Sequence, residues 1–478
     1  MQRPLPPRAP RHCPKLLCAA LLGAALAACS AGADPAAGQA APGQPVAPDP
    51  DAIAFVGVNV VPMDRERVLE GHTVVIRDGR IASVAPDDSQ VPEGAQRIDG
   101  EGRWLMPGLA EMHGHVPGPD DPAYAEDMLF LYVSNGVTTV RNMAGHAYHL
   151  ELRERIESGD LMGPTLFAAS PWLTPETAGT PEAAAQAVRD YHAQGFDLLK
   201  LGTIDAVSYA AMADTAHEVG MPFGGHIPAE VGLVGALDAR QTSIDHYDRY
   251  VEFLVPEDAD TGGTDPGFFG SGWVHLADRG RIPEAIERTL AAGTWNVPTL
   301  SLVEHLASDT PAEDMIAWPE MRYMPRRVRD GWVQAKQRFQ AREDFQPDAA
   351  QALVELRQEL TRALHAAGAP IALGSDAPQF FNVPGFSIHH ELRMMVAAGL
   401  TPYEVLATGT REPARYFGTP DAFGTVEEGR RADLILLEAN PLEDVANVQR
   451  RVGVMVHGQW LPEEEIRARL ERIAAAAD

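Results

Sequence analysis

Short apolar runs alternate with amphipathic stretches through the middle of the chain. Residues 181–195, for example, place Ala184 and Val188 on one face and stop at Gly195, a pattern typical of a helix packed on a core. Strands that alternate with helices in this way predict a parallel sheet, and eight such units close as a TIM-like (β/α)8 barrel within the α/β class. The predicted strands are residues 104–113, 137–143, 165–170, 197–202, 222–227, 242–247, 296–302 and 370–376.

Both ends of the chain carry β-branched runs outside this alternation. Residues 53–61 and 73–84 are predicted as strands, with a hairpin turn at Asp78-Gly79 inside the second run. Residues 433–438 and 452–456 are predicted as the matching strands near the C-terminal end of the chain. The predicted domains are therefore a small composite β-sandwich at 51–106 and 412–460, an inserted barrel at 107–411 and a C-terminal helix at 461–478.

Two long stretches interrupt the alternation. Residues 251–282 are rich in Gly and Asp, and residues 303–345 extend the same interruption. Connections of this length are uncommon in a compact domain unless they serve a function. We therefore predict that they are loops that form a lid or a wall beside the substrate.

The N-terminus has the pattern of a bacterial lipoprotein signal. Basic residues precede the short apolar run 16–28, which ends at Cys29. This pattern predicts a signal peptide over 1–28 and a lipid anchor on Cys29, with a plain secretory signal as the alternative. Ser30 after the cysteine favours the outer membrane of a bacterium, with the protein facing the periplasm. Residues 29–50 are Ala-, Pro- and Gly-rich and are predicted to be a flexible tether.

Composition narrows the possible functions. The net charge of -28 argues against nucleic acid as a partner, and against a polybasic membrane-binding surface. The three cysteines, Cys13, Cys18 and Cys29, all lie in the predicted signal or at its end. The body of the protein therefore has no internal disulfide, and a metal site there must use His, carboxylate or Lys ligands.

Polar side chains gather at the predicted carboxyl ends of the strands, where barrel enzymes keep their active sites. His113 and His115 are two residues apart on the first strand, so both face the same side and could bind an ion such as Zn²⁺. Each of the other candidates is unremarkable alone, but together they favour one metal site. The other candidates are Lys200, His226, His246 and Asp376.

These positions resemble the amidohydrolase superfamily. Met106-Pro107-Gly108-Leu109 ahead of His113 and His115 looks like its first-strand signature. Residues 136–141 resemble its second strand, and Gly374-Ser375-Asp376 resembles the aspartate motif of its eighth strand. The pattern is most similar to imidazolonepropionase-like and Xaa-Pro dipeptidase-like members.

The resemblance implies a role for each residue and two divalent metal ions, expected to be zinc. His113, His115 and Asp376 would bind the first ion, and His226 and His246 the second. Lys200, carboxylated on its amine, would bridge the ions. Asp376 would be the catalytic residue that takes a proton from water and passes it to the leaving amine.

Other polar residues are candidates for contacts with the substrate. His146, Tyr247 and His389 are predicted to line the pocket, and His390 could join them. Two residues depart from the pattern of the superfamily, Asn142 in place of Asp and Asp245 in place of Glu. Neither is an expected ligand, so these departures bear on the support of the site rather than on metal binding.

The sequence leaves three functions open. The first is hydrolysis of an amide or peptide-like C–N bond in a dipeptide or an N-acyl amino acid, with a small molecule or short peptide as the partner. The second is a mononuclear cyclic-amide hydrolase or deaminase, in which Lys200 stays unmodified. The third is a non-catalytic binding protein of the cell envelope. The sequence leaves the oligomeric state open, although members of this superfamily often assemble into homo-oligomers.

Overall fold

The computed structural model describes residues 47–343 and 345–477. The predicted signal, the Cys29 anchor and most of the tether lie outside these residues, and they remain predictions that the mass of the mature N-terminus would test. Within the described residues, no helix has the length and apolarity that a membrane span requires.

The central strands form two parallel sheets with the orders β6-β7-β8 and β9-β10-β11-β12. Parallel bridges between Ala169 and Leu198 connect the two sheets. Further parallel bridges run from Asn296 to Ile371 and from Ala377 back to Gly114 of β6. The pairing therefore passes through every central strand and returns to the first. These strands are β6 (Leu109–Gly114), β7 (Val137–Asn142), β8 (Thr165–Ala168), β9 (Leu199–Leu201), β10 (Phe223–Gly225), β11 (Ser243–Asp245) and β12 (Trp295–Val297).

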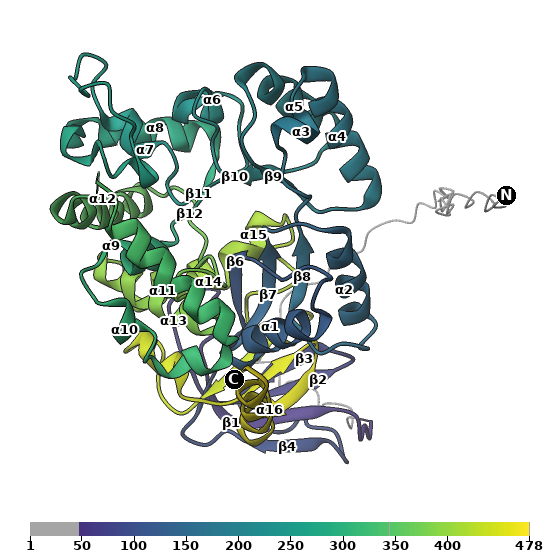
Figure 1. Cartoon of the computed structure of the whole chain (residues 1–478). Coiled ribbons are helices and arrows are strands. Elements are labelled where there is room, and N and C mark those ends of the chain that lie inside the picture. The colour runs from purple at the N-terminus through teal and green to yellow at the C-terminus, as the bar shows by residue number, and fades with distance from the viewer. Residues whose placement is uncertain (1–46, 344, 478) are drawn as a thin grey trace, which may run out of the picture. The chain divides into compact units, whose positions relative to one another are not determined.

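The two ends of the described chain share one eight-stranded sheet, with the order β15-β14-β13-β5-β1-β2-β3 and β4 paired with β1 (Figure 1). Its hairpins turn at Asp78-Gly79 and His457-Gly458, where all four residues have positive φ angles, as tight turns require. Its strands are β1 (Ile53–Val60), β2 (Leu69–Arg77), β3 (Arg80–Ala85), β4 (Gln96–Asp99), β5 (Trp104–Pro107), β13 (Leu434–Leu437), β14 (Arg451–Val456) and β15 (Gln459–Pro462).

Helices follow the central strands and cover them (Figure 1). The α-helices are α1 (Pro122–Ser134), α2 (Ala147–Glu157), α3 (Pro175–Ala178), α4 (Pro181–Gln194), α5 (Ala206–Val219), α6 (Gly232–Asp238), α7 (Tyr250–Leu254), α8 (Ile282–Ala292), α9 (Leu300–Ala307), α10 (Ala312–Met315), α11 (Arg326–Gln340), α12 (Pro347–Ala366), α13 (Phe386–Ala397), α14 (Pro402–Gly409), α15 (Arg411–Tyr416) and α16 (Glu463–Ala477). Short 3-10 turns are η1 (Phe268–Gly270), η2 (Val274–Leu276), η3 (Arg279–Arg281), η4 (Pro319–Tyr323) and η5 (Val445–Gln449).

Three expectations from the sequence are wrong in detail. The strand expected at 296–302 ends at Val297, because Thr299 turns with a φ of 48° and α9 begins at the next residue. The run 104–113 is two strands divided at Gly108, of which β5 belongs to the terminal sheet and β6 to the central strands. The stretch 303–345 is largely helical rather than a loop, because it contains α10, α11 and most of α9.

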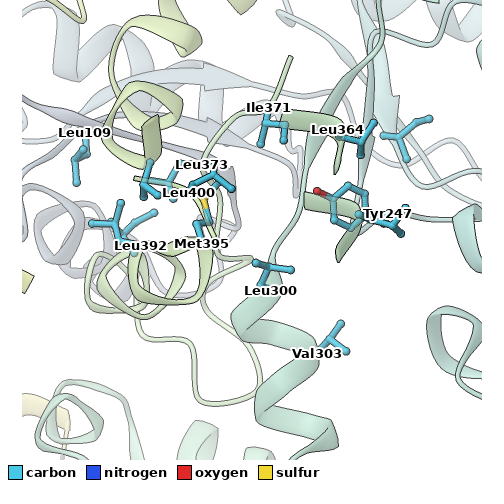
Figure 2. Close-up of a cluster of buried hydrophobic side chains, with 14 of the residues drawn as sticks. Leu109, Tyr247, Leu300, Val303, Leu364, Ile371, Leu373, Leu392, Met395 and Leu400 are labelled. Atoms are coloured by element: carbon cyan, nitrogen blue, oxygen red, sulfur yellow. The ribbon is translucent and has the colours of Figure 1, made fainter. Parts of the chain in front are cut away.

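The main core packs the central strands against the helices around them. Leu109 of β6 and Leu373 belong to the same buried cluster as Leu392 and Met395 of α13. Figure 2 shows these side chains together with Tyr247, whose ring joins the same apolar contacts. This packing fixes the strand ends that carry the polar residues.

Truncating Leu392 to alanine should lower the free energy of unfolding by about 2–5 kcal/mol, because removing a buried leucine side chain loses its contacts and leaves a cavity. The control is Leu290→Ala in α8, where the side chain is 40% exposed and the expected loss is below about 1 kcal/mol. Urea denaturation of both variants measures the difference, and equal losses would contradict a packed core around α13.

Candidate metal centre

The six residues that the sequence predicts as ligands come together in the structure. His113 lies in β6 and His115 directly after it, while Lys200 is the middle residue of β9. The remaining three follow the carboxyl ends of other strand segments: His226 after β10, His246 after β11, and Asp376 in the segment that bridges β12 and β6.

Three of these side chains could hold one ion. His113 Nε2 is 3.2 Å from His115 Nε2, and Asp376 Oδ1 is 3.2 Å from His115 Nε2 and 3.6 Å from His113 Nε2. Candidate ligand atoms of the three residues all lie within 4.8 Å of one another. Asp376 Oδ1 is buried and accepts no hydrogen bond from any described residue. A buried carboxylate oxygen that faces two imidazoles fits a divalent cation.

Lys200 lies against this group. Its side chain is completely buried, and Nζ is 3.5 Å from His113 Nε2 and 5.1 Å from the ring centre of Trp172. Burial lowers the pKa of Lys200, although the carboxylates of Asp245 and Asp376 act in the opposite direction. A buried lysine is rare without a partner, so its place beside the imidazoles indicates a function.

His226 and His246 stand next to each other on the same side of the site. Their ring centres are 4.9 Å apart, and His246 Nδ1 is 3.7 Å from Asp376 Oδ2. His226 Nδ1 lies 2.8 Å from Asp248 Oδ2, and His246 Nδ1 lies 2.8 Å from Thr299 Oγ1. Because these partners occupy Nδ1 of both rings, Nε2 of each is left as the potential metal ligand.

Asp245 orients His113 in the same manner. Asp245 Oδ2 is 2.7 Å from His113 Nδ1, and although the two atoms are not aligned as a hydrogen bond, the negative charge favours a proton on Nδ1 and leaves Nε2 as a lone-pair donor. The carboxylate also receives two hydrogen bonds from Arg141 Nη2, at 3.0 and 2.9 Å. This departure from the pattern of the superfamily therefore supports a ligand, and the signal for it was its position directly before His246.

Glu111 connects β6 to the segment that carries Asp376. One carboxylate oxygen accepts hydrogen bonds from the backbone N–H of His113 and of Ser375, at 2.9 and 2.8 Å, and the other accepts from the Ser375 hydroxyl. Burial raises the pKa of Glu111 to about 8. Sequence analysis missed this residue, although its spacing of two from His113 places it on the same face of the strand.

The predicted substrate contacts lie elsewhere. His146 is exposed at the start of α2, where Nδ1 accepts a hydrogen bond from the backbone N–H of Tyr148. The Tyr247 hydroxyl donates to Thr361 within the core, and His389 is hydrogen-bonded to Asn135. The structure gives all three of these residues other contacts and does not bring them to the six candidate ligands.

Asn142, the second departure, also has a supporting contact. Its side-chain oxygen accepts a hydrogen bond of 2.8 Å from the backbone N–H of Val116, and its amide nitrogen is 2.8 Å from His149 Nδ1. The first contact holds the loop after His115 directly, and the second does so through His149, whose Nε2 is 3.1 Å from the backbone oxygen of Pro117, so Asn142 positions backbone rather than a candidate ligand.

Two aromatic rings flank the candidate ligands, and sequence analysis missed both. The ring of Trp172, which is 40% exposed, is 5.9 Å from that of His226. The ring of Phe269 is 5.2 Å from that of His246. Phe269 has a φ of 48°, an unusual conformation for a bulky residue that is often kept at functional sites. It belongs to the long stretch 251–282, which the sequence predicts as a lid or wall without indicating which of its residues lies beside the site.

Comparison with known proteins agrees with this arrangement. A model of the amidohydrolase family matches residues 104–461. The chain belongs to the amidohydrolase family. Imidazolonepropionase of Chromobacterium violaceum is 25% identical to it over 396 residues, which cover 78% of this chain and 87% of that protein.

Two further proteins, one compared by sequence and one by structure, are also similar to this chain. Adenine deaminase 3 of Rhizobium johnstonii is 26% identical over 412 residues, so this amidohydrolase-family chain matches 54% of the length of that relative. The crystal structure of a Xaa-Pro dipeptidase with bound methionine is 21% identical, with a TM-score of 0.63, over 86% of this chain and all of the other. That likeness shows a shared fold.

Replacing Asp245 with asparagine should weaken metal binding about 10- to 100-fold, because His113 loses the charge that orients its ring. Titration of the metal-free protein with Zn²⁺ measures the affinity. Asp421→Asn, which removes an exposed carboxylate, is the control and should bind the metal as the unchanged protein does. An unchanged affinity in Asp245→Asn would show that this carboxylate does not support the site.

Proposed function

We propose that this amidohydrolase-family chain hydrolyses an amide or peptide-like C–N bond, in a dipeptide or an N-acyl amino acid. The observation that carries the proposal is the position of Lys200, which is buried with Nζ 3.5 Å from His113 Nε2. A lysine at this point suits a site for two ions that it bridges as a carbamate, whereas a mononuclear site has no use for it.

The chemistry of the donor set supports two ions. His113, His115 and Asp376 would hold one, His226 and His246 the other, and carboxylated Lys200 would lie between them. Divalent ions of the zinc type, when bound, lower the pKa of water and polarise a carbonyl group. The lowered pKa of Lys200 favours the uncharged amine, the form that can add CO₂.

Asp376 is suited to move the proton. Burial raises the pKa of Asp376 to about 6, close to the range in which a group both accepts and returns a proton near neutral pH. With Oδ1 as the candidate ligand atom beside the two imidazoles, the other oxygen, Oδ2, would accept a proton from water. We propose that Asp376 takes this proton and delivers it to the leaving amine.

The reaction can be tested with metal-loaded protein and a panel of substrates. The panel contains N-acyl amino acids and Xaa-Pro and other dipeptides on one side, and lactones, cyclic imides and adenine on the other. We expect turnover of the open-chain amides. In Asp376→Ala the turnover rate should fall at least about 1000-fold, because the variant loses both the proposed base and a candidate metal ligand. Turnover of cyclic substrates or adenine alone would favour the cyclic-amide hydrolase or deaminase, and metal binding without any turnover would favour a binding protein.

Lys200→Ala should bind fewer metal ions per chain than the unchanged protein, because the bridging ligand is lost. The measurement is elemental analysis of the purified protein after dialysis. Lys336→Ala is a useful control, because Lys336 is also buried but donates to the backbone oxygens of His305 and Ser308 instead. An unchanged metal content in Lys200→Ala would exclude the bridge.

Trp172 and Phe269 are proposed as the walls of the substrate pocket. Their rings face His226 and His246 respectively, so a side chain next to the scissile bond would lie beside apolar surface. Phe269→Ala and Trp172→Ala should each lower kcat/KM about 10- to 100-fold for substrates with Phe or Leu side chains, and much less for those with Gly. Trp172→Phe keeps the aromatic face and should retain the preference. A uniform loss across all side chains would contradict a wall.

We also propose that the central strands close as a (β/α)8 barrel and that the terminal sheet folds over as a β-sandwich. The bridges that return to β6 support the barrel. The bridge between Arg80 and Arg431, and the separate apolar cluster of Phe55, Val74 and Leu434, support the sandwich.

A further inference from the structure

One cavity of the protein lies apart from the candidate ligands. Its volume is about 540 Å³, and none of the six candidate metal ligands lines it. It is bounded by the residue after α1, by η4, by α13 and by β14. Residues on its wall include Asn135, Trp318, Tyr323, Phe386, His389 and Arg393.

The cavity is cationic in a chain with a net charge of -28. Arg322, Arg393 and Arg451 all line it. Within the described residues Arg393 has no hydrogen bond or ion pair, and the guanidinium of Arg322 contacts the ring of Tyr323 rather than a carboxylate. Both guanidinium groups are exposed, and two of them without a carboxylate partner on one cavity favour an anion there.

The carboxylates near the cavity are already engaged. Glu320, which lines it, is 2.9 Å from His390 Nε2. Arg451 is 3.3 Å from Glu463. Neither carboxylate makes a hydrogen bond or a close ion pair with Arg393 or Arg322, although the charge of Arg393 is one of the causes that lower the pKa of Glu320.

His389 supplies a buried polar atom without a partner. The Asn135 amide nitrogen donates to the Leu131 and Ser134 oxygens, so the Asn135 oxygen must be the acceptor for His389 Nε2. His389 is only 3% exposed, and its Nδ1 has no hydrogen bond with the described residues. Because Nε2 carries the proton, Nδ1 is a lone-pair acceptor, so a hydroxyl or N–H donor on a ligand, rather than its anionic group, would pair with it.

Flat apolar surfaces complete the wall. The rings of Tyr323 and Phe386 stack at 5.0 Å with an angle of 19°, and the ring of Trp318 is 5.1 Å from that of His390. All of these side chains are only partly buried and line the cavity, although Tyr323 also packs between Phe386 and the guanidinium of Arg322. Aromatic faces beside unpaired guanidinium groups recognise a planar ring that carries a negative charge.

From these contacts we propose that the cavity between η4, α13 and β14 binds a small aromatic anion, such as an aromatic carboxylate or phosphate. Its anionic group would pair with Arg393 and its ring would lie against Trp318, Tyr323 and Phe386. This site goes beyond the proposed hydrolase activity, since it shares no residue with the candidate metal centre.

The test is calorimetric titration of the purified protein with benzoate, phenyl phosphate and benzyl alcohol. We expect saturable binding of one or both anions at one site per chain, and no binding of the alcohol, which lacks the charge. Arg393→Gln should weaken binding about tenfold or more, as expected for loss of a charge-assisted hydrogen bond. Comparison of the two anions identifies the preferred head group.

Two controls separate this site from other causes. Arg189→Gln removes an exposed arginine of α4 that pairs with Glu218, and it should not change the affinity. Asp376→Ala should also leave it unchanged, because the candidate metal centre is not involved. The proposal is overturned if neither anion binds, if the alcohol binds as well as the anions, if Arg393→Gln binds normally, or if Asp376→Ala abolishes binding.

Discussion

The candidate metal centre depends on one buried ion pair, between Arg141 of β7 and Asp245 of β11. Neither side chain is exposed, and a buried charge is tolerated only when it is paired and hydrogen-bonded. Arg141 meets this condition by donating to both oxygens of Asp245, to Ser243 and Tyr416, and to the backbone oxygen of Met112. Because Asp245 also contacts His113 Nδ1, the pair ties β6, β7 and β11 together and fixes a ligand in the same step.

The short motif Gly374-Ser375-Asp376 has a physical reason at each position. A Cβ atom on Gly374 would lie 2.9 Å from the backbone nitrogen of His113, so the segment can approach β6 this closely only with glycine. Ser375 then donates through its N–H and its hydroxyl to Glu111, and Asp376 is left facing His115. The motif therefore combines a close approach, an anchor and a candidate ligand.

The six candidate ligands could be predicted to lie together because their signal is local: a polar residue at the end of an apolar strand. The supporting contacts were not local. Asp245 was noticed as a departure, but its role depends on Arg141, which lies more than a hundred residues away. Phe269 lies in a stretch without periodicity, so no pattern could place it beside His246. The strand predicted to reach residue 302 failed because apolar periodicity does not separate a short strand from a buried helix such as α9.

Lys200 also sets the charge of the site. Burial lowers the pKa of His113 and of His115, and an ammonium charge on Lys200, 3.5 Å from His113 Nε2, lowers both further. Neutral imidazoles are the form that binds metal, so burial already favours the binding form of these two candidate ligands. The same positive charge would repel a divalent ion at that distance. An ion at His113 would therefore require a Lys200 that is uncharged or carboxylated, which would couple the state of this buried lysine to the occupancy of the candidate centre.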